Sequence, residues 1–270
     1  MALPPAAPDG TAVVTGASSG IGAAIARELA ERGYGVTLVA RRAERLESLA
    51  EELRRRGVRA EALAADLADR SVRAELLGRV DGLGLEPHIL VNNAGLSTLG
   101  AVARSDPEAE LHMLEVNIMA VADLCSRFVP GMVERGRGAV LNVASTAAFQ
   151  PLPGQSGYAA SKAFVLSYTR GLDAELHGSG VMAAALCPGP VETEFEEVAG
   201  FSEGAAEAGL PRFMWESPES VARTGVEALA RSRSVAIPGT ANRVAAHLST
   251  VTPKRLLLPI LRARHPGLQG

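Results

Sequence analysis

The chain has 270 residues, a length that a single α/β domain commonly reaches, and hydrophobic residues make up 47% of it, enough for a large core. Its net charge of -3 gives no reason to expect nucleic acid as a partner. Cys125 and Cys187 stand far apart and in no C-x-x-C pattern, which argues against a disulfide framework or a thiolate metal site and fits a reducing cytoplasm. We expect no signal peptide, because residues 1–10 lack a basic start, and no transmembrane helix, because no run of about 18 apolar residues occurs.

Short apolar runs alternate along the chain with segments whose apolar residues recur at helical spacing. Ile21, Ile25 and Leu29 mark the first such helix, and Gly33 follows at a position typical of a helix C-cap. This alternation predicts a parallel sheet with helices on both faces, joined by right-handed crossovers. The seven predicted strands are 12–14, 36–39, 60–63, 89–91, 139–143, 182–186 and 235–237.

The first predicted strand runs directly into a glycine-rich turn, Thr15-Gly16-Ala17-Ser18-Ser19-Gly20-Ile21-Gly22, where a helix begins. The three glycines allow a tight turn and let the backbone approach a pyrophosphate, and the helix N-terminus adds free N–H groups and a positive dipole end. The spacing is G-x-x-x-G-x-G rather than G-x-G-x-x-G, so this loop alone leaves open a glycine-rich turn without a ligand.

The second predicted strand ends in Ala40-Arg41-Arg42. In dinucleotide-binding folds a carboxylate at this place binds the ribose 2′-hydroxyl of NAD, whereas arginine accommodates the 2′-phosphate of NADP. The sequence has no acid here, and a guanidinium can direct two N–H groups at phosphate oxygens. The two arginines could simply begin a solvated helix over 43–56, but that reading leaves the missing acid unexplained. We therefore predict NADP(H) as the cofactor.

Three further motifs follow the glycine-rich turn: Asn92-Asn93-Ala94-Gly95 after the fourth strand, Ser145 after the fifth, and Tyr158-Ala-Ala-Ser-Lys162 on a predicted helix. Together the four elements resemble the short-chain dehydrogenase/reductase family, in its compact single-domain branch, over about residues 10 to 240. The resemblance implies a seven-stranded parallel sheet in Rossmann order. It also implies hydride transfer between the nicotinamide and a carbonyl or alcohol carbon, and assembly into homodimers or homotetramers.

Tyr158 and Lys162 are four positions apart on the predicted helix and therefore share one face. A free tyrosine, with a pKa of about 10, is a poor base at neutral pH, and we expect the lysine ammonium to lower that pKa. Ser145, at the carboxyl edge of the sheet, can donate a hydrogen bond to a substrate oxygen. Each of these residues alone has an ordinary structural explanation. The resemblance assigns Tyr158 as general acid and base, and gives Asn117 the support of a water between Lys162 and solvent.

Further cofactor contacts are implied by the resemblance. Asp66, after the third strand, matches the position that contacts the adenine amino group, although a helix N-cap before Leu67 would also explain it. After the sixth strand, the main chain near Val191 and the Thr193 hydroxyl would bind the carboxamide, although Pro188-Gly189-Pro190 could be a rigid turn and nothing more. The predicted cofactor-binding residues are Gly16, Ser18, Ser19, Gly20, Ile21, Gly22, Arg41, Arg42, Asp66, Asn93, Ala94, Gly95, Tyr158, Lys162, Pro188, Gly189, Val191 and Thr193.

The segment over 191–216 is expected to select the substrate. Its apolar residues suggest a medium to large apolar carbonyl or alcohol compound, since ligand pockets are lined mainly by apolar side chains. An alternative, equally open, is that its aromatic residues pack a helical lid onto the core. The predicted pocket residues are Phe195, Val198, Phe201, Leu210, Phe213, Met214 and Trp215 from this segment, with Leu96, Leu99, Phe149, Gln150 and Leu152 from elsewhere.

Two other functions remain open at this point: binding of the cofactor without turnover, and redox-neutral chemistry on the same fold. The complete set of predicted catalytic residues argues against the first. The short C-terminal portion argues against the longer sugar-nucleotide branch, which appends a substrate domain.

The last part of the chain differs in charge from the rest. No Asp or Glu follows Glu227, whereas 7 Lys and Arg residues do, so residues 1–227 carry a net charge of -10. A basic segment with an apolar cluster over 256–261 could lie in a membrane interface, or could dock on a neighbouring subunit or on its own domain. Pro253 and Pro259 should interrupt a long amphipathic helix, so we favour docking. We divide the chain into a loose tail over 1–10, a catalytic domain over 11–242 and a basic tail over 243–270.

Overall fold

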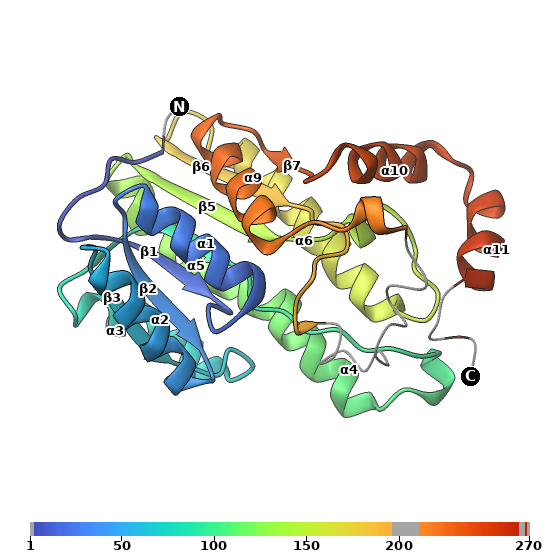
Figure 1. Ribbon diagram of the computed structural model, residues 1–270, viewed down its shortest axis with the longest axis horizontal. Helices are drawn as coiled ribbons and strands as arrows, with labels where there is room; N and C mark the ends of the chain where they lie inside the picture. Colours follow the sequence, from blue (N-terminus) through green and yellow to red (C-terminus); the bar gives the residue numbers. More distant parts are fainter. Residues whose placement is uncertain (1–2, 196–210, 265–267, 269–270) are drawn as a thin grey trace.

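The computed structural model describes residues 3–195, 211–264 and 268. A seven-stranded parallel sheet in the order β3-β2-β1-β4-β5-β6-β7 forms its centre (Figure 1). All the predicted strands are present, and their order is the Rossmann order that the resemblance implied. The strands are β1 (Gly10–Thr15), β2 (Gly35–Ala40), β3 (Ala60–Ala64), β4 (Glu86–Asn92), β5 (Gly138–Val143), β6 (Val181–Leu186) and β7 (Val235–Ala236).

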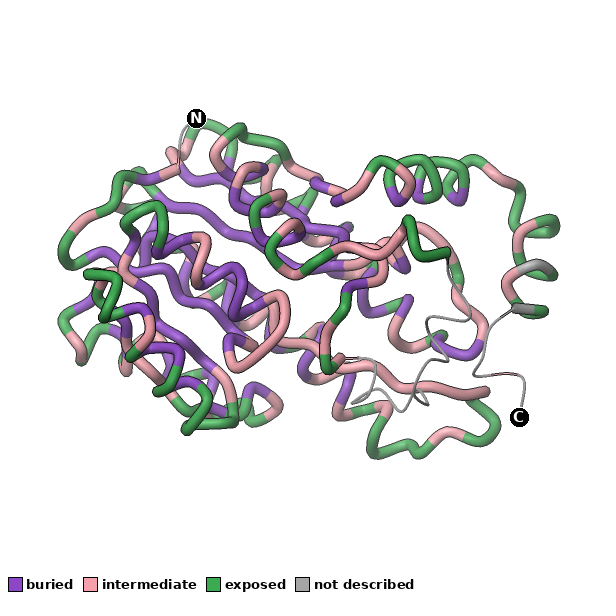
Figure 2. Tube along the Cα trace, viewed as in Figure 1, coloured by how far each residue is buried: buried purple, intermediate pink, exposed green. Residues whose placement is uncertain are grey.

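Helices cover both faces of the sheet because successive strand residues point to opposite sides. Val14 of β1 packs in the core on one side, and Val13 in the core on the other. The first core takes its helical residues from α1 (Gly20–Glu31), α2 (Ala43–Arg55) and α9 (Pro218–Ala230). The second takes them from α3 (Arg70–Asp81), α5 (Ala120–Glu134) and α6 (Ser156–Glu175). β1, β4, β5 and β6 are buried nearly throughout, as expected of a parallel sheet between two helical layers, whereas the edge strand β3 is mostly partly exposed (Figure 2).

One helix is long and apolar enough to cross a membrane by length and composition, which the sequence did not lead us to expect. It spans Pro107–Glu134 and joins α4 (Pro107–Leu114), the π-helical turn η2 (Glu115–Met119) and α5. Its most apolar window is 44% buried. Leu124, Phe128 and Met132 lie in the core beside β4 and β5. The apolar character therefore serves the packing of the sheet.

Both ends of the chain contact the domain. Pro4 is buried and its carbonyl accepts a hydrogen bond of 2.7 Å from the Tyr34 hydroxyl, so the expected loose tail is held at this point. At the other end, α10 (Thr240–Val251) and α11 (Lys254–Arg264) lie near the carboxyl edge of the sheet (Figure 1). The predicted boundary at residue 242 falls inside α10, which packs against η3 (Thr146–Phe149) and η4 (Arg212–Met214). A short turn, η1 (Val102–Arg104), completes the described elements.

Candidate active site

A cavity of about 810 Å³ opens at the carboxyl edge of the sheet, between the loops that follow the strands. Ligands bind at this edge in open α/β sheets, because the strand order reverses here and the loops diverge. Two predicted site residues, Gly22 and Asn117, do not line the cavity. The others do: Gly16, Ser18, Ser19, Gly20, Ile21, Arg41, Arg42, Asp66, Asn93, Ala94, Gly95, Ser145, Tyr158, Lys162, Pro188, Gly189, Val191 and Thr193.

The glycine-rich turn is shaped by close backbone contacts. A Cβ atom on Gly22 would lie 2.3 Å from the Gly16 carbonyl oxygen, so Gly22 lets α1 begin tightly against β1 instead of forming a cavity wall. Thr15 Oγ1 accepts hydrogen bonds from the backbone N–H groups of Asn93, at 2.9 Å, and Ala94, at 3.0 Å. Asn93 Nδ2 donates to the Thr15 carbonyl at 3.0 Å. These contacts hold the ends of β1 and β4 together beneath the cavity.

Arg42 lies at the mouth of the cavity among hydroxyl groups. Its Nη2 donates to Ser18 Oγ at 2.9 Å and to Ser19 Oγ at 2.7 Å, while Nη1 donates to Glu194 Oε2 at 2.9 Å. Arg45, which the sequence reasoning missed, also donates to Glu194, at 2.8 Å. The hydrogen bonds from Arg45 and Arg42 lower the pKa of the Glu194 carboxyl. Two guanidiniums and two hydroxyls form a donor set that fits a phosphate group.

Tyr158, Lys162 and Ser145 converge on the same cavity from α6 and from the end of β5. Lys162 Nζ donates to the Val143 carbonyl at 3.0 Å and lies 5.8 Å from the centre of the Tyr158 ring. Ser145 Oγ donates to the Pro188 carbonyl at 3.4 Å and accepts from the Ala147 N–H at 3.1 Å. The three side chains predicted to act together are therefore brought together, and main-chain carbonyls fix the directions of Lys162 and Ser145.

The expected lowering of the Tyr158 pKa is wrong for this structure. Burial raises the pKa of the Tyr158 phenol to about 12, and a hydrogen bond with Ser145 opposes this only in part. Burial also lowers the pKa of Lys162 to about 8. The ammonium is bound to the Val143 carbonyl, so removal of both groups from water outweighs their attraction. A phenol with this pKa stays protonated at neutral pH.

Lys162 should give stability a distinct pH dependence. Its pKa falls from 10.5 to about 8 on folding, so between these values the unfolded chain binds more protons than the folded protein. The free energy of unfolding then rises with pH in this window. We expect wild type to gain about 2 kcal/mol relative to Lys162→Met between pH 8 and about 10, measured by urea unfolding. A difference between the two proteins that stays constant with pH would contradict this.

Asn117 is fully buried in the π-helical turn η2. Its side chain accepts from the Leu96 N–H at 2.9 Å, and donates to the Leu96 carbonyl at 2.9 Å and to Ser161 Oγ at 3.0 Å. It thereby fixes the loop after β4 against α6. A Cβ atom on Gly95 would lie 3.3 Å from both Asn117 Oδ1 and Lys162 Nζ, so a glycine keeps the space between these two groups free.

The predicted substrate pocket is only partly realised. Leu96, Gln150, Leu152, Phe195 and Met214 line the cavity, and the Phe195 ring lies 5.9 Å from that of Tyr158. The cavity lining does not include Leu99, Phe149, Phe213 or Trp215, and Phe213 is 74% exposed. Val198, Phe201 and Leu210 lie outside the described residues.

Sequence reasoning missed part of the cavity wall. The additional lining residues include Gln155 and, from the C-terminal helices, Asn242, Ala245, Ala246, Ser249 and Leu261. The second group falls in or next to the segment that we had set apart as a tail. A signal was present, because Asn242, Ala246 and Ser249 recur at helical spacing and are small or polar among larger apolar residues.

Comparisons with known proteins agree with this geometry. The family model of the short chain dehydrogenases matches residues 10–201. A short chain dehydrogenase of Pseudocercospora fijiensis is 39% identical over 186 residues, 68% of this chain but only 60% of that protein. A very-long-chain 3-oxoacyl-CoA reductase of Anas platyrhynchos is 36% identical over 219 residues, 80% of this chain and 67% of that protein.

Solved structures extend the similarity over nearly the whole chain. A short-chain dehydrogenase from Sphingobium yanoikuyae in complex with NADPH is 34% identical, with a TM-score of 0.78 over 92% of this chain and 95% of that one. Similar structures hold either NADPH or NAD. The family model and these relatives cover most of the chain, and the chain belongs to the short-chain dehydrogenase/reductase family.

Proposed function

We propose that this protein is an NADP(H)-dependent oxidoreductase that transfers a hydride between the nicotinamide and a carbonyl or alcohol carbon of an apolar substrate. One observation carries the proposal: Tyr158, Ser145 and Lys162 face the same cavity as the glycine-rich turn and Arg42. The Tyr158 phenol can donate a proton, the Ser145 hydroxyl can donate a hydrogen bond, and Lys162 supplies a positive charge. Carbonyl reduction requires such groups beside the dinucleotide site.

The bound cofactor would supply the hydride, and the residues of this chain would move the proton and orient the reactants. In the reducing direction Tyr158 donates the phenolic proton to the carbonyl oxygen. Ser145 donates a hydrogen bond to the same oxygen and holds the carbonyl in place. Lys162 would bind the ribose hydroxyls, and Asn117 would support a water between Lys162 and solvent.

The preference for NADP(H) rests on the end of β2. Arg41 and Arg42 follow the strand, and no carboxylate stands there. Arg42 donates hydrogen bonds to the hydroxyls of Ser18 and Ser19. A ribose 2′-phosphate would find guanidinium and hydroxyl donors there, whereas a 2′-hydroxyl would lack its usual carboxylate acceptor. Steady-state kinetics with both coenzymes tests this. A kcat/KM with NADH equal to or above that with NADPH would overturn the preference.

Glu194 should weaken the binding of NADPH, because its carboxylate pairs with Arg42, a cation that a 2′-phosphate would use, as well as with Arg45. We expect Glu194→Gln to tighten NADPH about fivefold and to change NADH little, since the pair is exposed to solvent. Quenching of Trp215, the only tryptophan, measures both dissociation constants. Glu192→Gln is a matched control, because that carboxylate pairs with Arg212 instead. An equal change for both coenzymes would contradict a specific effect on the phosphate.

The substrate is proposed to be a bulky apolar ketone or alcohol. Leu96, Leu152, Phe195, Met214 and Leu261 line the cavity. A relative is named as a reductase of very-long-chain 3-oxoacyl-CoA, a substrate with a long apolar chain. Oxidation of NADPH on addition of a panel of carbonyl compounds tests the reaction and the substrate class together. Turnover limited to small charged carbonyls would overturn the substrate class, and none with any carbonyl would overturn the reaction.

We also propose that the protein is a cytoplasmic homodimer or homotetramer. Cys125 and Cys187 are buried, unpaired thiols, as a reducing compartment allows. The long helix exposes Leu111 and Met119, at 60% and 52%, to solvent, and an exposed apolar helix face suits contact with a second copy. Light scattering on the purified protein measures the mass, and a monomer would overturn the proposal.

A further inference from the structure

The C-terminal helix α10 is amphipathic in the opposite sense to an ordinary surface helix. Its face toward the domain carries Asn242, Ala246 and Ser249, which are 1%, 3% and 7% exposed. Its outer face carries large apolar residues at the same helical spacing, Val244, Leu248 and Val251, which are 53%, 55% and 61% exposed. A helix packed only against its own domain would place these side chains the other way round.

The inner face explains why this orientation is fixed. Asn242 Nδ2 donates to the Met214 carbonyl at 3.0 Å, and a Cβ atom on Gly189 would lie 2.4 Å from Asn242 Oδ1. Ala246 and Ser249 line the cavity. Small and polar residues are therefore required where α10 meets the active site, and rotation of the helix to bury its leucine and valines would break these contacts. The outer face needs a separate explanation.

The apolar surface continues past the corner between the helices. Thr252 and Pro253 separate α10 from α11, and Lys254 Nζ donates to the Ser249 carbonyl at 2.7 Å. On α11, Leu256 is 59% exposed. We define the C-terminal apolar face as Val244, Leu248, Val251 and Leu256. The helices lie at one end of the molecule, and the tube there is mostly green on its outer side (Figure 2).

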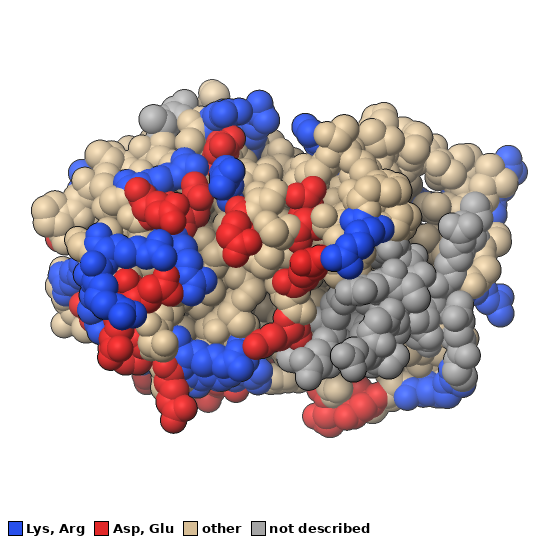
Figure 3. Space-filling view, viewed as in Figure 1, with Lys and Arg blue, Asp and Glu red and all other residues tan. Residues whose placement is uncertain are grey.

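The rim of the C-terminal apolar face is cationic. Arg243, Lys254, Arg255 and Arg262 are exposed, and within the part of the chain that the structure describes none of them forms an ion pair. The chain has no acid after Glu227. In Figure 3 the atoms over α10 and α11 are tan and blue, whereas red atoms lie elsewhere on this side. This end of the molecule is thus apolar and positive.

An apolar surface of this kind could be covered by a second copy of the chain or by a lipid surface. The charge around it decides between these two occupants. A second copy bound through a twofold axis would bring two cationic rims into one interface, and the repulsion between them is unfavourable. An anionic lipid surface attracts these cations while its interface accepts the valines and leucines. We had expected the two prolines of this segment to interrupt an amphipathic helix and so to disfavour membrane contact. Pro253 lies between the helices, however, and Pro259 does not end α11.

We propose that the C-terminal apolar face binds the surface of an anionic phospholipid bilayer, with α10 and α11 lying in the interface without spanning it. The inner side of α10 lines the cavity, so this contact would place the active site beside the bilayer.

Co-sedimentation of the full-length protein with vesicles tests the proposal. We expect binding to vesicles of equal parts phosphatidylglycerol and phosphatidylcholine, and little binding to pure phosphatidylcholine. The triple variant Val244→Ser, Leu248→Ser, Val251→Ser should weaken the partition at least about tenfold. Arg243→Gln with Arg255→Gln should weaken it by about fivefold for each charge removed, and salt should weaken it in wild type.

A matched control replaces two exposed apolar residues that belong neither to this face nor to the proposed subunit contact of Leu111 and Met119: Val102→Ser and Val133→Ser. It should bind the vesicles as wild type does, and the NADPH dissociation constant should be unchanged in the C-terminal variants if they fold. Absence of wild-type binding to the anionic vesicles would overturn the proposal, and so would undiminished binding by a folded Val244, Leu248 and Val251 variant. If that variant instead has a smaller mass in solution and lipid binding is unaffected, a second copy occupies the face.

Discussion

Replacement of Tyr158 by phenylalanine is expected to lower kcat for carbonyl reduction about 10³-fold, while the NADPH dissociation constant changes less than about threefold. The change removes only the hydroxyl, which is the proton donor in the proposed reaction. The ring keeps its place, because Phe195 lies 5.9 Å away and Lys162 is held by the Val143 carbonyl, not by the phenol. The loss should therefore appear in the chemical step and not in folding or in cofactor binding.

Tyr168→Phe is the matched control for this experiment. Tyr168 lies on the same helix α6, is partly buried, and stacks on Phe164 with ring centres 5.6 Å apart. It does not line the cavity. NADPH oxidation with the best substrate of the carbonyl panel should be unchanged in this variant. If Tyr158→Phe keeps more than about a tenth of the wild-type kcat, the proton must come from another group and the assignment fails.

Local sequence patterns predict the sheet well, because a strand buried on both faces must be apolar over its own length. The runs at 139–143 and 182–186 lie within β5 and β6. The motif residues of the site are equally readable. Most of them follow a strand or lie in the first turns of a helix that follows one, so the parallel topology brings their positions to one edge, with Asn117 of the long helix as the exception.

Features that depend on contacts between distant segments could not be predicted. Arg42 and Glu194 are 152 residues apart, and nothing near either position indicates the pair. The pKa of Tyr158 is raised, whereas we expected it to be lowered. The spacing of Tyr158 and Lys162 in the sequence does not reveal how deeply the two side chains are buried. The inner residues of α10 recur at helical spacing in the sequence, but this spacing does not show that Gly189 and Met214 lie against Asn242.

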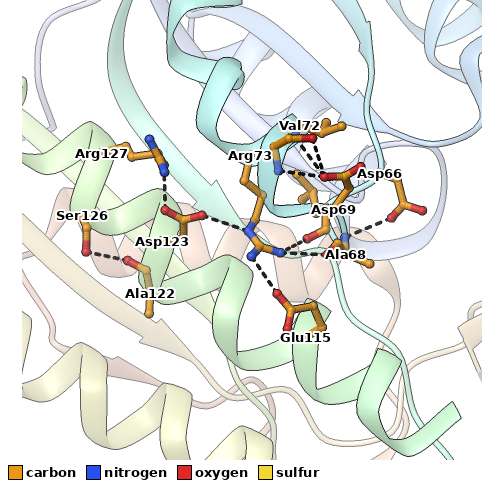
Figure 4. A network of polar contacts seen from close by, with 12 residues as sticks. Asp66, Ala68, Asp69, Val72, Arg73, Glu115, Ala122, Asp123, Ser126 and Arg127 are labelled. Atoms are coloured by element: carbon orange, nitrogen blue, oxygen red, sulfur yellow. Dashed lines mark hydrogen bonds and ion pairs between the residues drawn. The ribbon is translucent and has the colours of Figure 1, made fainter. Parts of the chain in front are cut away.

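Arg73 is the clearest unpredicted residue. It belongs to α3, and its side chain is only 3% exposed. Its guanidinium donates to Asp123 Oδ2 at 3.0 Å and to Glu115 Oε1 at 2.7 Å, both on the long helix. It also donates to the Leu67 and Ala68 carbonyls, at 2.7 and 3.1 Å, in the loop that carries Asp66 (Figure 4). One side chain thus joins α3, the helix that holds Asn117, and the loop predicted to contact the adenine.

Arg73→Met should lower the free energy of unfolding by about 3 kcal/mol, the lower end of the range for breaking a buried ion pair. The lower end applies because Glu115 and Asp123 are 37% and 21% exposed, so water can partly replace the guanidinium. The melting temperature should fall by about 6–12 °C. Arg73→Lys should recover only part of this loss, since an ammonium cannot direct donors at four acceptors in one plane.

Urea unfolding of the single variants and of the double variant with Asp123→Asn measures the coupling. Arg73→Met alone leaves the Asp123 carboxylate without its guanidinium partner, and the double variant removes that unpaired charge. The double variant should therefore be more stable than the sum of the two single losses predicts. Strict additivity would mean that Arg73 acts through the carbonyls of Leu67 and Ala68 alone. In that case, if Asp66 binds the adenine as we propose, the NADPH dissociation constant should rise in Arg73→Met and stay unchanged in Asp123→Asn.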